Sequence, residues 1–306
     1  MVEVILHKIP VPLNNVEVGE PVPAPIFVKM HSAYILFRVT GDTISSEDID
    51  RLTFRKVNEL YINEKDEVGF SGWLKKDVPA DTSPVGVVKT ETKRALLDIF
   101  QNGINDQNIK QAVASSKSMA TQMLKNPYVG KALAQLRKNG SGIVDHSVNV
   151  GVLSTYLGMQ MGYTQQVILS NLSMGGILHD IGKSAIDIKE SDTDEEVDEK
   201  LKEHPTLGAK LAEELHSIPE EVKLIISMHH ENYDGSGYPK GLKKIDIFDL
   251  AKIVSIANKF DRLVSNSSGD LAERQKRAIT DIGSTYQHEF DPTKLGKALK
   301  ILSMGV

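Results

Sequence analysis

Six of the nine histidines lie between residues 146 and 230, and the helix face that carries each one decides what it can do. His146 is in line with Val150, Leu153 and Leu157, at offsets of four, seven and eleven residues. These offsets follow one face of an α-helix, so the pattern predicts that His146 points into the core. A buried imidazole needs a hydrogen-bond partner or a metal.

A His-Asp pair follows a second apolar segment. Leu172 and Leu178 belong to that predicted helix, and Gly182 is expected to end it. His179 and Asp180 would therefore leave the core together at the C-terminal end of the helix. An imidazole beside a carboxylate is a combination that divalent metals favour.

Two further predicted helices carry three more histidines at their ends or on their inward faces. His204 precedes Pro205, and proline is favoured at the first position of a helix. His229 continues an inward stripe that includes Ile226, and His230 lies one step beside it. In total, five histidines on four predicted helices thus occupy core-facing or terminal positions.

Five imidazoles and Asp180 in one helical core predict a site for metals that prefer nitrogen and oxygen ligands. For one such histidine alone, a hydrogen-bonded core residue is the more frequent explanation. Burying all six groups without a metal would need a partner for every polar atom, which a helical core does not readily supply. The remaining histidines are interpreted as structural or surface residues: His7, His31, His216 and His288.

The composition excludes several other kinds of function. There is no cysteine, which rules out disulfides, thiolate nucleophiles and thiolate metal ligands and fits a reducing compartment. Lys and Arg number 36 against 41 Asp and Glu, a net charge of -5, so we do not expect a nucleic-acid polymer as a partner. No apolar run approaches the about 18 residues of a membrane span, and we expect a cytoplasmic protein.

A length of 306 residues suggests two domains, at about 150 residues each. Residues 33–39 and 59–62 are rich in strand formers, and Ser45 with Asp48 forms a capping box that opens a helix between them. Beyond the segment 77–86 the pattern is helical, with an interruption at Asn102 and Gly103. The predicted divisions are a small α+β domain (1–80), linker helices (81–128) and an all-α domain (129–306).

The order of the motifs resembles that of the HD-GYP family, a branch of the HD superfamily of metal-dependent phosphohydrolases. The resemblance rests on His146, residues 178–183 (LHDIGK), His204-Pro205 and residues 229–242 (HHENYDGSGYPKGL). It extends to about residue 292 and covers close to half of the chain. It implies an HD-type helical domain behind the small α+β N-terminal domain.

The resemblance also implies a centre of two divalent metals, with iron expected first and manganese or zinc as alternatives. Asp180 would bridge the two metals and is the implied catalytic carboxylate, while Lys183 would neutralise a phosphate oxygen. The implied metal ligands are His146, His179 and Asp180 with Asn258 for the first metal, and His204, His229 and His230 with Asp180 for the second.

The Gly-Tyr-Pro segment is expected to form a loop beside the metals. Gly235 and Gly237 permit a positive φ and a close approach of the backbone, and Pro239 restricts the exit of the loop. In the family this loop shapes the substrate pocket and contacts partners. The implied substrate-binding residues are Lys183, Asp234, Gly237, Tyr238 and Pro239.

Three departures from the family pattern bear on activity. Asn258 stands where the family has a metal-binding Asp, so one negative ligand is lost. Gly142 occupies the position of a Glu that holds a third metal in some members, and we expect no third metal. Residues 266–269 (NSSG) replace an Arg-Pro-Tyr segment that helps to hold the dinucleotide.

The leading hypothesis is a phosphodiesterase with a binuclear metal centre that hydrolyses cyclic di-GMP or a related cyclic dinucleotide. The alternative is a weak or silent HD-GYP module that binds a nucleotide or a signalling partner through the Gly-Tyr-Pro loop. A third interpretation is an HD hydrolase for another phosphoester, because the lost contacts are specific to cyclic di-GMP. The helices between residues 88 and 125 could pair in a homodimer.

Overall fold

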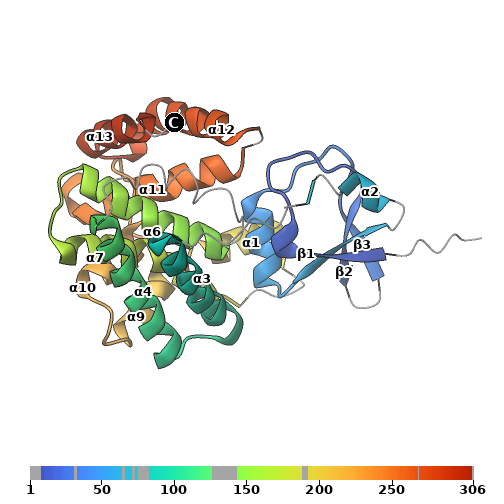
Figure 1. The fold of residues 1–306 in the computed structure, drawn as a ribbon, viewed down its shortest axis with the longest axis horizontal. Coiled ribbons are helices and arrows are strands. Elements are labelled where there is room, and N and C mark those ends of the chain that lie inside the picture. Colours follow the sequence, from blue (N-terminus) through green and yellow to red (C-terminus); the bar gives the residue numbers. More distant parts are fainter. Residues whose placement is uncertain are drawn as a thin grey trace, which may run out of the picture.

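The computed structural model describes residues 8–30, 33–63, 66–70, 73–74, 83–125, 143–187, 192–267 and 269–304. Within these ranges the chain forms a β-rich N-terminal domain and a larger helical domain, with helix α1 between them (Figure 1). This architecture confirms the predicted small α+β domain followed by an all-α helical domain. Gly142 and residues 77–82 lie outside the described ranges.

The N-terminal domain contains a four-stranded antiparallel sheet with the strand order β1-β4-β2-β3. Strands β3 and β4 match the two predicted strand segments, whereas β1 and β2 were not recognised. Two prolines, Pro10 and Pro12, obscure β1, which tolerates them because it is an edge strand that pairs only with β4. The elements are β1 (Lys8–Pro12), η1 (Leu13–Asn15), β2 (Ile26–Met30), β3 (Ala33–Arg38), α1 (Ser46–Phe54), β4 (Glu59–Asn63) and α2 (Glu67–Phe70).

Helix α1 begins at the predicted capping box. The Ser45 side chain accepts a hydrogen bond from the Asp48 backbone N–H, and the Asp48 carboxylate accepts one from the Ser45 backbone N–H at 2.9 Å. Ile49 and Leu52 are buried in the core of the N-terminal domain, as predicted. The opposite side of α1 is thereby turned towards the helical domain, which it contacts through polar side chains.

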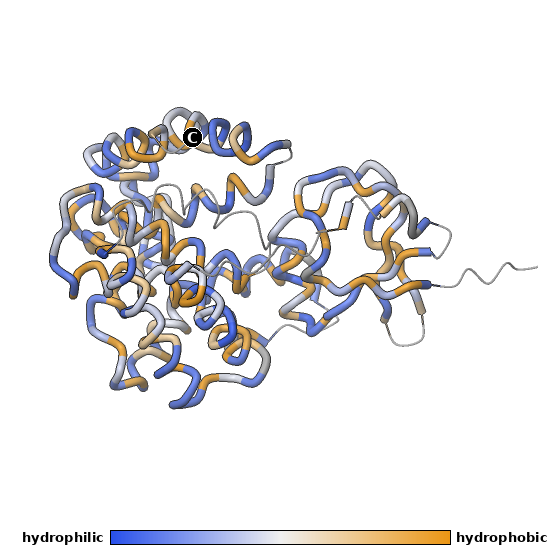
Figure 2. The backbone as a smooth tube through the Cα atoms, viewed as in Figure 1, coloured by the Kyte–Doolittle hydropathy of each residue, from blue (hydrophilic) through white to orange (hydrophobic). Residues whose placement is uncertain are grey.

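The helical domain consists of amphipathic helices, and the tube of α12 and α13 alternates between hydrophobic and hydrophilic residues (Figure 2). None of its described helices is long and apolar enough to cross a membrane. The elements are α3 (Pro84–Asn102), α4 (Asp106–Lys125), α6 (Ile143–Gln160), α7 (Gln166–Leu178), η3 (Ile181–Ala185), α8 (Asp194–Leu201), α9 (His204–Glu213), α10 (Glu220–Met228), η4 (Lys244–Asp246), α11 (Asp249–Ser265), α12 (Leu271–Ser284), η5 (Gln287–Glu289) and α13 (Pro292–Ser303).

Helices α3 and α4 are separated at Gly103, as the sequence predicts, but they do more than connect the domains. Leu96 and Ile109 are fully buried in one apolar cluster with Val148 of α6 and Ile177 of α7. Both helices therefore pack into the core of the helical domain, because their apolar faces cover α6 and α7.

A close contact between α6 and α7 brings the first candidate ligands together. A Cβ atom on Gly176 would lie 2.6 Å from the Cα atom of Gly151, so the two backbones approach to a distance that only glycine permits. This contact lies five residues after His146 and three residues before His179. The packing of the two helices therefore holds both histidines at the same end of the pair.

Candidate metal centre

The first candidate ligand set comes from α6 and the end of α7. His146, His179 and Asp180 each offer a ligand atom within 4.8 Å of the others, and we call them the His146 group. The Nε2 atoms of His146 and His179 lie 3.9 and 3.3 Å from Asp180 Oδ2. Three of the side chains predicted to hold the first metal thus meet in space, and Asn258 is the fourth predicted ligand.

The second set comes from the start of α9 and the end of α10. Asp180, His204, His229 and His230 also lie within 4.8 Å of one another, and we call them the His204 group. The Nε2 atoms of His204 and His229 lie 3.1 and 3.9 Å from Asp180 Oδ1. Each carboxylate oxygen of Asp180 therefore faces a different group, which is the arrangement of a bridging ligand.

Four of the five imidazoles are oriented by their Nδ1 atoms. A carbonyl oxygen can only accept, so a histidine bonded to one carries its proton on Nδ1 and keeps the Nε2 lone pair for a metal. The acceptors are Asp261 Oδ2 for His146 (2.8 Å), Gly176 O for His179 (2.7 Å), Leu201 O for His204 (2.5 Å) and Ile226 O for His229 (2.8 Å).

Burial favours the neutral form of four imidazoles, those of His146, His204, His229 and His230. It lowers the pKa of His146 and His204, and it lowers the pKa of His229 and His230 further, with neighbouring imidazoles adding to the effect. Only a neutral imidazole can donate a lone pair to a metal. The surroundings therefore favour the protonation state that metal binding requires.

Several buried polar atoms in the centre make no hydrogen bond with any described residue. Among them are Nε2 of His146, Nε2 of His179 and Oδ1 of Asn258. Unpaired buried acceptors are costly in a protein core, at about 1–3 kcal/mol each. A divalent cation would accept all three lone pairs, so the donor set fits the metals that the resemblance implies. The role of Asn258 as a ligand stays a prediction.

Asp180 is also held by two cationic side chains. Lys183 Nζ lies 2.8 Å and Arg262 Nη2 lies 3.4 Å from Asp180 Oδ2. Burial acts to raise the pKa of Asp180, but the neighbouring His179 and Lys183 outweigh it and hold that pKa well below its usual range. Asp180 is therefore ionised, as a bridging ligand must be. Lys183 was expected here from the sequence, whereas Arg262 was not.

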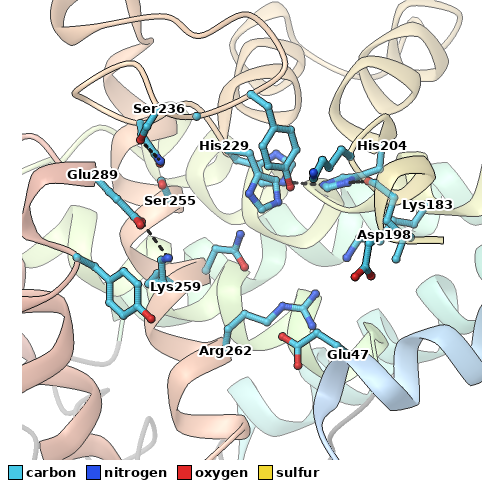
Figure 3. Close-up of a pocket in the computed structure, with 18 of the residues that line it drawn as sticks. Glu47, Lys183, Asp198, His204, His229, Ser236, Ser255, Lys259, Arg262 and Glu289 are labelled. Carbon is cyan, nitrogen blue, oxygen red and sulfur yellow. Dashed lines mark hydrogen bonds and ion pairs between the residues drawn. The ribbon is translucent and has the colours of Figure 1, made fainter. Parts of the chain in front are cut away.

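A cavity of about 950 Å³ opens above the centre (Figure 3). It lies within the size range of small-molecule sites. His204 and Lys183 lie on one side of it, while Lys259 and Arg262 on α11 lie on another (Figure 3). The lining is strongly polar and carries both charges, with four cationic side chains (Lys183, Lys202, Lys259 and Arg262) and five carboxylates (Glu47, Glu195, Asp198, Glu199 and Glu289).

The Gly-Tyr-Pro loop is folded against the second ligand set. A Cβ atom on Gly237 would lie 2.3 Å from the His230 carbonyl oxygen, so glycine is required by close packing. The Tyr238 ring stacks on the His230 ring at 4.5 Å between centroids. Buried Glu231, which the sequence reading missed, accepts hydrogen bonds from the backbone N–H groups of Lys240 and Leu242, both at 2.7 Å.

The predicted substrate contacts divide into two sets. Lys183, Gly237 and Tyr238 line the cavity. Asp234 and Pro239 are exposed and do not line it. The Asp234 Oδ1 atom accepts hydrogen bonds from the Ser236 N–H at 2.9 Å and hydroxyl at 2.7 Å. It stabilises the turn of the loop instead.

The sequence did not predict the group of lining residues around Lys259. Lys259 Nζ lies 2.9 Å from Glu289 Oε2 and 4.0 Å from the ring centre of Tyr286. The signal available in the sequence was the position of Lys259 beside Asn258 in the second-half motif. The pairing with residues 286 and 289 could not be read from it, because those residues lie on a segment 27 or more positions away.

A profile of the HD domain matches residues 109–294, which is more than half of the chain. The chain belongs to the HD domain family. The match includes both ligand groups, and together with the curated relatives it confirms the resemblance to HD-GYP proteins.

Two curated relatives and one solved structure are similar to this HD-domain chain. It is 26% identical over 274 residues to the cyclic di-GMP phosphodiesterase PA4108 of Pseudomonas aeruginosa, covering 81% of this chain and 66% of the relative. It is 31% identical over 161 residues to a cyclic di-GMP phosphodiesterase of Thermotoga maritima, covering 51% of this chain and 44% of the relative. The chain therefore spans less than two thirds of either relative.

The structure of Bd1817, an HDG"Y"P protein from Bdellovibrio bacteriovorus, superposes with a TM-score of 0.61 at 22% identity. The alignment covers 97% of this chain and 100% of Bd1817. It therefore includes the N-terminal domain as well as the helical one, and it supports the same fold for both domains.

Proposed function

We propose that this protein is a metal-dependent phosphodiesterase that hydrolyses cyclic di-GMP or a related cyclic dinucleotide at a binuclear centre. The observation that carries the proposal is the sharing of Asp180 between two groups of histidines beside a polar cavity that Lys183 lines. Relatives named as cyclic di-GMP phosphodiesterases support this substrate class.

Each part of the centre has a role in this proposal. The His146 and His204 groups would hold two divalent metals, with iron first and manganese or zinc as alternatives. When bound, such metals polarise a phosphodiester and lower the pKa of a bound water. Lys183 is a charged donor at the cavity wall for a phosphate oxygen, and Tyr238 covers the metal side of the cavity from the Gly-Tyr-Pro loop.

A specific observation favours a second candidate, a weak or silent module that binds a nucleotide or a signalling partner. Asn258 supplies no charge where the family has a carboxylate, and Arg262 adds a positive charge near Asp180. Both features disfavour a divalent cation at the His146 group. A partner at the Gly-Tyr-Pro loop, a homodimer and a cytoplasmic location also stay predictions.

Turnover of cyclic di-GMP by metal-restored protein tests the proposal. Asp180→Ala should reduce turnover by about 100-fold or more, because no neighbouring carboxylate can replace the bridge. His204→Ala should remove one ligand from one group and cost less. His216→Ala, at an exposed histidine outside both groups, is the matched control and should match the wild type.

The outcome separates the two candidates. An active wild type whose turnover is lost in Asp180→Ala, with its helical circular dichroism retained, supports the enzyme. A wild type that binds the nucleotide but does not hydrolyse it with iron or manganese supports the silent module.

A further inference from the structure

Helix α1 of the N-terminal domain forms part of the wall of the metal centre. Ser46 donates hydrogen bonds to Asn266 Oδ1 from its N–H at 2.9 Å and from its hydroxyl at 2.5 Å. Asn266 Nδ2 in turn donates to both carboxylate oxygens of Glu47, at 2.9 and 2.7 Å. Glu47 and Arg262 point towards each other across the cavity wall (Figure 3). The N-terminal domain is thereby joined to α11 next to the ligands.

Arg262 connects this wall to the central carboxylate. Its Nη1 atom lies 2.8 Å from Asp50 Oδ2 on α1, and its Nη2 atom lies 3.4 Å from Asp180 Oδ2. Asp50 is 3% exposed, and its other oxygen makes no hydrogen bond with any described residue. A buried carboxylate needs a charged partner, and Arg262 supplies it to Asp50 at 2.8 Å.

The guanidinium acts on one ligand group more than on the other. It contacts Oδ2 of Asp180, the oxygen that faces His146 and His179, whereas Oδ1 faces His204. A fixed positive charge beside a ligand oxygen opposes the binding of a divalent cation there. Asn258, one helical turn before Arg262, supplies no negative charge to offset it.

We propose that Arg262 is a positioning residue that weakens divalent-metal binding at the His146 group relative to the His204 group, and that Asp50 of the N-terminal domain sets the strength of this effect. While α1 is docked, Asp50 neutralises part of the charge on Arg262. If α1 separates, the full charge acts on Asp180. The N-terminal domain thereby controls how completely the centre is filled. The inference rests on the proposed function only in that the centre binds metals.

Titration of metal-free, full-length protein with Mn²⁺, followed by calorimetry and by electron paramagnetic resonance, measures the weaker of the two sites directly. Arg262→Gln should tighten this site by about tenfold, and Arg262→Lys, which keeps the charge, should stay close to the wild type. Asp50→Asn should act in the opposite direction and weaken the site by several-fold. In the Arg262→Gln background, Asp50→Asn should have no further effect, and this double variant leaves no unpaired buried charge.

Arg51→Gln is the matched control. Arg51 lies on α1, as Asp50 does, and pairs with Asp198 rather than with Asp180. Its affinity for Mn²⁺ should equal that of the wild type. The inference is overturned if Arg262→Gln leaves the weaker site unchanged, or if Asp50→Asn shifts it in the same direction as Arg262→Gln. Intact Mn²⁺ binding without turnover of cyclic di-GMP would count against the proposed function alone. A wild type that binds no Mn²⁺ would overturn both.

Discussion

Substituting Gly182 by alanine should disturb the metal centre without touching a ligand. Gly182 lies in η3, two residues after Asp180, and packs against the first turn of α9. A Cβ atom at this position would lie 2.0 Å from the carbonyl oxygen of His204 and 2.4 Å from the backbone nitrogen of Gly208. Both are backbone atoms, so no side-chain rotation can relieve the overlap.

The size of the effect follows from these distances. Ordinary contact begins at 3.4 Å, so η3 and α9 must separate by about 1.4 Å at the His204 carbonyl. His204 Nε2 and Asp180 Oδ1 are 3.1 Å apart on these two segments, and metal sites tolerate ligand displacements of only about 0.2 Å. Overpacking of a core costs about 1–3 kcal/mol, and a clash with backbone belongs at the upper end of that range.

Thermal unfolding followed by circular dichroism, with Mn²⁺ titration of the same samples, measures both consequences. For a domain of this size, about 3 kcal/mol corresponds to a fall in Tm of about 6–12 °C. Affinity at the His204 group should fall by at least about tenfold. Gly296→Ala is the matched control, because a Cβ on this α13 residue meets no atom within 4 Å, and alanine should stabilise the helix by up to about 1 kcal/mol.

The reasoning is refuted if Gly182→Ala melts within about 2 °C of the wild type and binds Mn²⁺ with unchanged affinity. That result would mean that the contact between η3 and α9 does not position His204 against Asp180. A lower Tm with unchanged Mn²⁺ affinity would support the predicted loss of stability but refute the predicted effect on the His204 group.

Three further expectations concern metal and pH. Strong chelation should lower the Tm of the helical domain, because the unpaired lone pairs of His146 and His179 lose their acceptor; an unmoved melting curve counts against a structural metal. Asn258→Asp should raise metal occupancy at the His146 group, as measured by elemental analysis, since it restores a negative charge; equal occupancy would place Asn258 outside the ligand set. In metal-free protein, the pKa values of His229 and His230 are lowered, so below about pH 6.5 the unfolded chain binds more protons than the folded chain does. The free energy of unfolding from urea titrations should therefore be highest above that pH and fall below it. A flat or inverted pH profile would contradict the burial of neutral imidazoles.

The sequence by itself determined which residues could be ligands and which way they point. His146 shares a face with Val150 and Leu153, and His229 with Ile226, because helical periodicity is a local property that neighbouring residues reveal. The same locality explains why the capping box at Ser45 and the helix break at Gly103 were predicted correctly. Strand β1 was missed because its prolines are tolerated only at the edge of a sheet. Which strand lies at the edge depends on pairing with distant strands, and not on neighbouring residues.

Only the tertiary structure decided what surrounds these ligands. Asp50 and Arg262 are separated by 212 positions, yet their 2.8 Å contact joins the N-terminal domain to the metal centre. Packing likewise drew α3 and α4 into the helical core and left Asp234 outside the cavity. Such contacts depend on how whole elements dock, which is the sum of many weak apolar interactions across the chain. The local sequence pattern does not reveal how whole elements dock. It therefore identified the ligands but not the charged residues that contact them.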